Sequence, residues 1–141
     1  MLKFKNVIQG FFLSCLLLIG VAQADQLQTE QTLTHHLESF GAGDIPAIMS
    51  DYADNAVVFL PNGILKGKAE ITGLFDALVA EFGQEGVVFN LQHSAVDGEV
   101  AYIIWNAETP NNSYTFATDT FLVKDGKIMV QTIAFNAVPK S

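Results

Sequence analysis

Three stretches of the chain carry apolar residues at the spacing of an amphipathic helix. The first lies between positions 26 and 40, on the stripe formed by Leu33, Leu37 and Phe40. Gly41 to Gly43 would end it, because glycine adopts the left-handed conformation that follows many helices. A short second stripe runs from Ile45 to Tyr52, behind Asp44, whose carboxylate can cap a first helical turn. The third and widest stripe consists of Ile71, Leu74, Phe75, Leu78, Val79 and Phe82.

β-Branched and aromatic residues dominate the remaining segments and predict strands. A short strand is expected over Ala56 to Leu60, followed by a Pro61-Asn62-Gly63 turn and a brief return at Ile64-Leu65. From position 87 onward, turn dipeptides such as Asp97-Gly98 separate longer strands. These strands are Val87 to Val96, Glu99 to Glu108, Tyr114 to Val123 and Ile128 to Val138. The order predicts an α+β domain that ends in an antiparallel meander.

The strand from Val100 is apolar on both faces. Ala101, Ile103 and Trp105 alternate along one face, while Tyr102 and Ile104 lie on the other. An antiparallel sheet that is covered on one side only should alternate apolar and polar residues. We therefore expect one face to pack on the third helix and the other to meet a second copy, in a homodimer through the sheet.

The first 24 residues have the pattern of a signal peptide. Lys3 and Lys5 precede an apolar run, and Ala22-Gln23-Ala24 supplies the small residues of a cleavage site. The sequence predicts cleavage after Ala24 and a periplasmic or secreted protein with no membrane contact thereafter. Residues 25–141 then form one domain, and it contains no cysteine, so no disulfide can stabilise it.

The charge of the chain limits its partners. The formal net charge is −8, no arginine is present, and loss of Lys3 and Lys5 makes the protein more acidic still. Nucleic-acid binding depends on clustered basic side chains, so we exclude it, and strongly anionic ligands are disfavoured as well. The three histidines lack metal-ligand spacing. No motif for a phosphate-bearing cofactor is complete, and we therefore expect neither metal nor cofactor.

Several short motifs resemble one protein superfamily. They are Gly43-Asp44, Tyr52-Ala53-Asp54-Asn55-Ala56, Pro61-x-Gly63 and Gly67-x3-Ile71. In this order they resemble the nuclear transport factor 2-like superfamily, in its SnoaL-like and ketosteroid-isomerase-like branch, over essentially all of residues 25–141. The resemblance implies a cone-shaped α+β fold, with three N-terminal helices packed on a curved, mostly antiparallel sheet and a ligand in the interior. Such folds host isomerases, dehydratases, cyclases, hydrolases and binding proteins, so the fold alone does not select a reaction.

Asp119 is the sharpest candidate for chemistry. It lies on the strand face Thr115, Ala117, Asp119, Phe121, Val123, between apolar neighbours. Desolvation there would raise the pKa of its carboxyl group and could keep it protonated as a donor. By pattern, Asp119 resembles the neutral oxyanion aspartate of ketosteroid isomerase. A partly exposed carboxylate, or one bonded to a neighbouring hydroxyl, is the structural alternative.

The sequence departs from ketosteroid isomerase at two positions that the resemblance makes important. Leu60 occupies the place of the carboxylate base, and His36 replaces the oxyanion tyrosine. Leucine cannot abstract a proton, so steroid isomerisation by that mechanism is not expected. Tyr52 resembles a supporting tyrosine found in part of the family.

His93 shares its predicted strand face with Phe89 and Leu91, where it could act as a general base or be a core residue. Gln131 is a candidate for orienting a ligand, and the predicted pocket walls are Trp105, Phe121 and Phe135. Three functions remain open. The first is an exported SnoaL-like protein that binds a small, largely apolar, uncharged molecule, with at most weak catalysis. The second is a cofactor-free lyase or isomerase that uses His93 and Asp119 as acid and base, and the third is a non-catalytic dimeric accessory module.

Overall fold

Two helices begin the fold in the computed structural model, which describes the backbone of residues 8–141 and the side chains of residues 22–141. Helix α1 spans Ile8–Ala42 and helix α2 spans Ile45–Asp51. Between them, Gly43 adopts a φ of 68°, and the Asp44 carboxylate accepts a hydrogen bond from the Ala47 N–H at 3.0 Å. The predicted cap and helix stop are therefore present.

Helix α1 begins earlier than the apolar stripe predicted. It starts at Ile8 rather than at position 26, because the segment predicted as a leader continues the helix without a glycine or proline break at its junction. The side chains of Ala22, Gln23 and Ala24 are exposed, and Thr29 is the first buried residue between positions 22 and 42 of α1. Lys3 and Lys5, the predicted basic start of the leader, lie outside the described residues.

Six strands form one sheet in the order β2-β1-β6-β5-β4-β3. They are β1 (Tyr52–Leu60), β2 (Gly63–Lys66), β3 (Val88–Asp97), β4 (Val100–Glu108), β5 (Asn112–Lys124) and β6 (Lys127–Pro139). All neighbouring pairs are antiparallel except β1 and β6, which run parallel. Tyr52 opens β1 instead of closing the second helix, as its helical spacing had predicted.

Helix α3 (Gly67–Phe82) follows β2, in the place that the order of the sequence patterns predicted. Glu70 accepts a hydrogen bond from the Lys66 backbone N–H at 2.7 Å, which caps the start of α3. Gly83 ends the helix by donating its N–H to the Val79 carbonyl. The apolar stripe of α3 buries Ile71 and Phe75, as the sequence pattern predicted.

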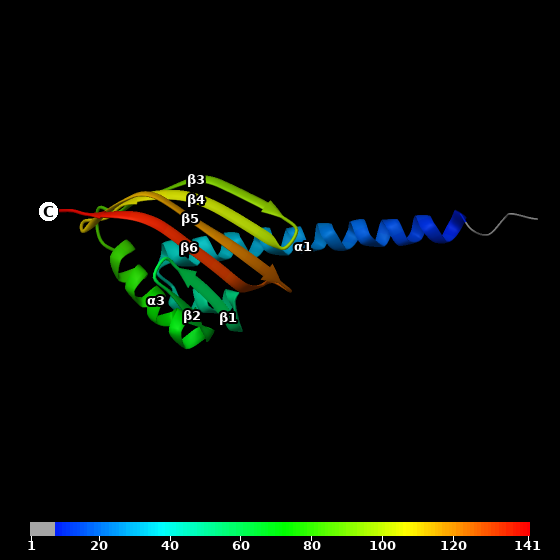
Figure 1. Cartoon of the computed structure of the whole chain (residues 1–141), viewed down its shortest axis with the longest axis horizontal. Helices are drawn as coiled ribbons and strands as arrows, with labels where there is room; N and C mark the ends of the chain where they lie inside the picture. Colours follow the sequence, from blue (N-terminus) through cyan, green and yellow to red (C-terminus); the bar gives the residue numbers. More distant parts are fainter. Residues whose placement is uncertain (1–7) are drawn as a thin grey trace, which may run out of the picture.

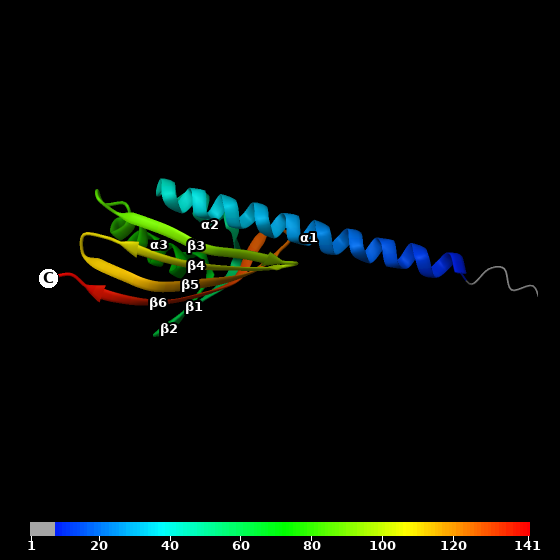
Figure 2. The same cartoon turned by 90° about the horizontal axis from the view of Figure 1, so that it is seen from above.

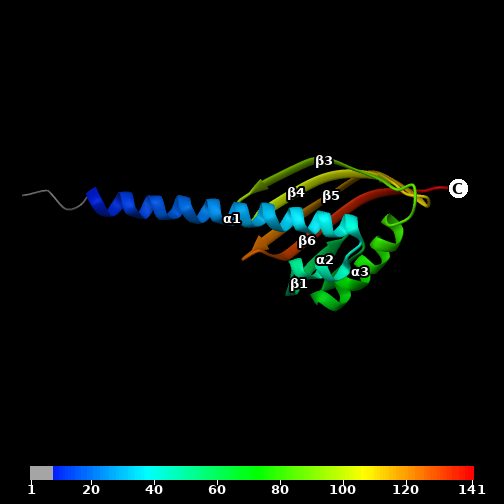
Figure 3. The ribbon, with the colours of Figure 1, turned by 180° about the vertical axis from the view of Figure 1, so that it is seen from behind.

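The helices occupy one side of the curved sheet. Helix α1 crosses in front of the strands when the molecule is seen from behind (Figure 3), and its N-terminal part projects beyond the sheet (Figure 1). The view from above separates α1 from the strand layer (Figure 2). The covered face of β4 carries Ala101, Ile103 and Trp105, all buried, while Tyr102 and Ile104 on the other face are half-exposed.

One carboxylate holds the end of α3 to the loop between β4 and β5. Glu81 accepts hydrogen bonds from Thr109, Asn111 and Asn112, the last two at 2.9 and 2.8 Å. These bonds lower the pKa of Glu81 below its ordinary value. Within residues 8–141, no helix combines the length and apolar character needed to cross a bilayer.

Candidate functional site

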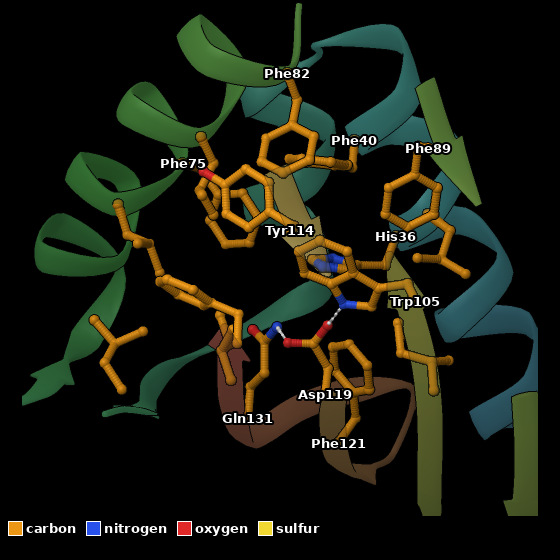
Figure 4. Close-up of a pocket in the computed structure, with 17 residues that line it drawn as sticks. His36, Phe40, Phe75, Phe82, Phe89, Trp105, Tyr114, Asp119, Phe121 and Gln131 are labelled. Atoms are coloured by element: carbon orange, nitrogen blue, oxygen red, sulfur yellow. Dashed lines mark hydrogen bonds between the residues drawn. The ribbon is translucent and has the colours of Figure 1, made fainter. Parts of the chain in front are cut away.

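A pocket lies between the helices and the covered face of the sheet (Figure 4). Its volume is about 70 Å³. Most of the 17 lining residues are apolar or aromatic. Apart from the indole of Trp105 and the phenol of Tyr114, the polar side chains in the lining are His36, Asp119 and Gln131. A largely apolar cavity with a few convergent polar groups is typical of small-molecule sites.

Asp119 projects into this pocket from β5, as its strand face predicted. Its carboxylate accepts a hydrogen bond from Trp105 Nε1 at 2.7 Å and a longer one from Gln131 Nε2 at 3.4 Å (Figure 4). Gln131 Oε1 in turn accepts a short hydrogen bond from the Tyr52 hydroxyl. The four side chains form one buried chain of hydrogen bonds that ends at the carboxylate.

Burial raises the pKa of Asp119 to about 6, although the bonds from Trp105 and Gln131 oppose the rise. The carboxyl group is therefore mostly ionised at pH 7, as an acceptor, and becomes a donor only in mildly acidic solution. This differs from a fully neutral acid because the indole N–H stabilises the charged form. Burial, reinforced by the charges of Asp119 and Asp51, raises the pKa of Tyr52 well above its ordinary value, so its phenol stays protonated.

A second polar pair lies on the helix side of the pocket. His36, from α1, lines the pocket, and its buried Nδ1 is 3.6 Å from the buried Oδ2 of Asp51 at the end of α2. Asp51 Oδ1 contacts Nδ1 of the exposed His35 at 2.7 Å. Sequence reasoning missed Asp51. The spacing of α2 could have found it, because Asp51 follows the buried Ile48 by three positions and so shares its face.

His93 is not in the pocket, contrary to the alternation that placed it beside Leu91. A β-bulge separates these two residues: Leu91 pairs with Trp105, but His93 pairs with Ile104. One extra residue in a strand reverses the side to which the following side chains point. His93 is therefore exposed on the opposite face of the sheet, where its ring packs edge-on against that of Tyr102, with 6.5 Å between the ring centroids.

The remaining predicted site residues divide into two groups. Trp105, Phe121, Gln131 and Phe135 line the pocket, together with His36 and Asp119. Tyr52 lies behind the lining, where it supports Gln131. Tyr114 was not predicted to line the pocket, because a bulge in β5 turns it inward and leaves Thr115 exposed.

This arrangement can bind an apolar molecule and present it with hydrogen-bonding groups on two sides. Asp119 supplies an acceptor from the sheet, and His36 supplies an imidazole from α1. The residues that the structure describes contain no group of three histidine, cysteine or acidic side chains placed to hold a metal ion.

The family model for the SnoaL-like domain matches residues 33–131, which include all the pocket residues of α1, α3, β4 and β5. The chain belongs to the SnoaL-like family. This membership, within the nuclear transport factor 2-like superfamily, confirms the resemblance drawn from the sequence motifs. No curated protein sequence matches the chain.

Solved structures with the same fold include enzymes and NTF2-like proteins of unknown function. The epoxide hydrolase/cyclase-like enzyme SalBIII is 19% identical, with a TM-score of 0.68 over 79% of this chain and 93% of that one. A Kribbella flavida protein provisionally named a ketosteroid isomerase is 14% identical, with a TM-score of 0.67 over 83% of this chain and 84% of that one. An NTF2-like protein from Mesorhizobium loti is 22% identical, with a TM-score of 0.68 over 79% of this chain and 93% of that one. At these identities the similarity establishes the fold.

The raised pKa of Asp119 predicts an unusual pH dependence of stability. A carboxyl group whose pKa rises from 3.8 to about 6 on folding binds more protons when folded, so its contribution to stability falls as the pH rises through that interval. The loss is about 3 kcal/mol when complete. Asp119→Asn keeps an acceptor for Trp105 without the charge. We expect it to stabilise the protein at pH 8 by up to about 3 kcal/mol and to have little effect near pH 4.

Urea denaturation of both proteins at the two pH values measures this difference. Asp54→Asn, at an exposed carboxylate, is the matched control and should change stability little at either pH. Equal destabilisation by Asp119→Asn at pH 4 and pH 8 would show that Asp119 is not a desolvated charge.

Proposed function

We propose that this SnoaL-like protein binds a small, largely apolar, uncharged molecule in the pocket beneath α1 and α3. The observation that supports the proposal is the contrast between the apolar lining and the single buried carboxylate at its centre. Most of the binding free energy would come from apolar contact, while Asp119 and Gln131 would orient one polar group of the ligand.

The charge and the exposed rim of the pocket agree with such a ligand. Phe89 and Phe135 line the pocket yet are 39% and 43% exposed, so these two apolar side chains lie between the pocket and solvent. The chain is acidic overall, and the pocket contains no lysine. An anionic ligand would meet an ionised Asp119 with no cation to balance it.

A second candidate function is cofactor-free acid–base chemistry of the isomerase or lyase type. Two titratable side chains of different kinds, His36 and Asp119, border the same pocket, which favours this candidate over a purely accessory module. In this version His36 replaces His93 as the proposed base, because His93 is on the far face of the sheet. An accessory module would need no open cavity, so the pocket argues against the third possibility.

We further propose export, with cleavage after Ala24. Ala22, Gln23 and Ala24 are exposed, and the buried residues among positions 22–42 of α1 all follow Ala24, so cleavage would leave this packed part of the helix intact. Mass measurement of the protein recovered from the cell envelope should give a chain that begins at Asp25. A chain that retains its N-terminus would contradict export by this route.

Dimerisation through the uncovered sheet face is a separate proposal. That face is turned toward the viewer in Figure 1. The strand register places on it the exposed Phe59, Ile64 and Phe116 and the half-exposed Ile104 and Leu122. Exposed apolar patches of this kind are typical of protein interfaces. Light scattering should give twice the monomer mass, and Ile104→Lys should give a monomer. Ala80→Lys, on the exposed side of α3, should leave the dimer intact, whereas a monomeric wild-type protein would refute the proposal.

Binding can be followed through the one tryptophan of the chain, Trp105, whose indole N–H lies in the pocket. We expect uncharged 2-methoxynaphthalene to shift the indole N–H resonance in a saturable way, and anionic naphthalene-2-sulfonate to leave it unchanged. Leu78→Phe should weaken binding at least tenfold by filling the pocket.

The control for this substitution is Leu27→Phe, the same change at an exposed position of α1, which should bind as the wild type does. Equal binding of the neutral and anionic probes, or unchanged binding in Leu78→Phe, would contradict the proposed function.

A further inference from the structure

Two buried polar atoms without hydrogen bonds face each other beside the pocket. They are Nδ1 of His36 and Oδ2 of Asp51, each without a partner among the described residues. Leaving such a buried donor or acceptor unpaired is unfavourable, because the group loses its hydrogen bonds to water and gains none in the protein. The two atoms are 3.6 Å apart, slightly beyond hydrogen-bond distance, so a small rotation of the imidazole would pair them. Long hydrogen bonds in ligand-free sites often shorten when a ligand binds.

The surroundings of His36 leave Asp51 as the natural partner of Nδ1. Three aromatic rings contact the imidazole edge-on, each with a centroid separation of 5.5 Å, and they belong to Tyr52, Phe75 and Phe121. The titratable groups around His36 are Asp51 from α2, Tyr52 from β1, Asp119 from β5 and the neighbouring His35. The Tyr52 hydroxyl already donates to Gln131, and Asp119 is occupied by Trp105 and Gln131.

We propose that Asp51 is a positioning residue that fixes the tautomer of His36, with the proton on Nδ1, so that Nε2 accepts a proton or hydrogen bond from a ligand hydroxyl. The part of this proposal that concerns the ligand rests on the proposed function. It specifies that the apolar ligand carries one hydrogen-bond donor group. His35 supports the arrangement, because its 2.7 Å contact with Oδ1 fixes the carboxylate and leaves Oδ2 for His36.

The proton balance is simple. If His36 removes the hydroxyl proton, the O–H bond of the ligand breaks, its electron pair stays on the oxygen, and an N–H bond forms at Nε2. The imidazolium then carries protons on both nitrogens, and the Asp51 carboxylate stabilises it through Nδ1. Return of the proton to the ligand restores the neutral imidazole, so no further reactant is needed.

Nitrogen NMR tests the positioning role without any ligand. In ¹⁵N-labelled protein at a pH where the imidazoles are neutral, we expect the His36 ring to show the Nδ1–H tautomer. In Asp51→Asn the amide can donate a hydrogen bond to Nδ1, so the population of the Nε2–H tautomer should increase. Asp54→Asn, an exposed carboxylate 3.1 Å from Lys68, should leave the His36 spectrum unchanged. A wild-type His36 in the Nε2–H form would overturn the proposal, even if Asp51→Asn failed to fold.

A pair of matched probes tests the preference for a donor. We expect 2-naphthol to bind at least tenfold more tightly than 2-methoxynaphthalene, which has no hydroxyl proton. In Asp51→Asn the ratio of the two affinities should fall toward one. Equal affinity of the two probes for the wild type would refute the donor preference while leaving apolar binding intact. Failure of both probes to bind would refute the proposed function for this ligand class, and the tautomer measurement would still decide the role of Asp51.

Discussion

A carboxylate buried in an apolar pocket is the constraint on which the rest of the site depends. A charge in such a place is costly unless hydrogen bonds compensate it. The sheet supplies these bonds from both neighbouring strands. Asp119 pairs directly with Ile103 on β4 and Ile133 on β6, and its two donors, Trp105 and Gln131, are the diagonal neighbours at these pairings. The register of three strands therefore determines the polarity of the pocket.

The helix layer adds a different kind of polar group. His36 and Asp51 come from two helices joined by a turn at Gly43, whose positive φ reverses the chain and brings the end of α2 beside α1. The Asp44 cap and the Gly43 turn, although distant from any ligand, thus set the distance between an imidazole and its carboxylate. The pocket has Asp119 on its sheet side and His36 on its helix side, and apolar side chains line the space between them.

The sequence predicted the element order, the wide face of α3 and the inward position of Asp119, because these follow from periods of 3.6 and 2. It failed where the period is interrupted. The bulge after Leu91 moved His93 to the far face, and the bulge near Tyr114 brought that ring inward. Bulges depend on pairing with another strand, so one strand's alternation cannot reveal them. The helical spacing of α2 places Asp51 on its buried face, but the pairing of Asp51 with His36 depends on the packing of two helices and cannot be read from the sequence.

Titration of the Asp119 side-chain carboxyl by ¹³C NMR tests the central claim most directly. In the folded protein the carboxyl resonance should change with a pKa of about 6. Asp54, which is exposed, provides an internal comparison in the same spectrum. A pKa for Asp119 near the ordinary 3.8 would mean that water reaches the carboxylate, and it would contradict the claim that the pocket desolvates this group.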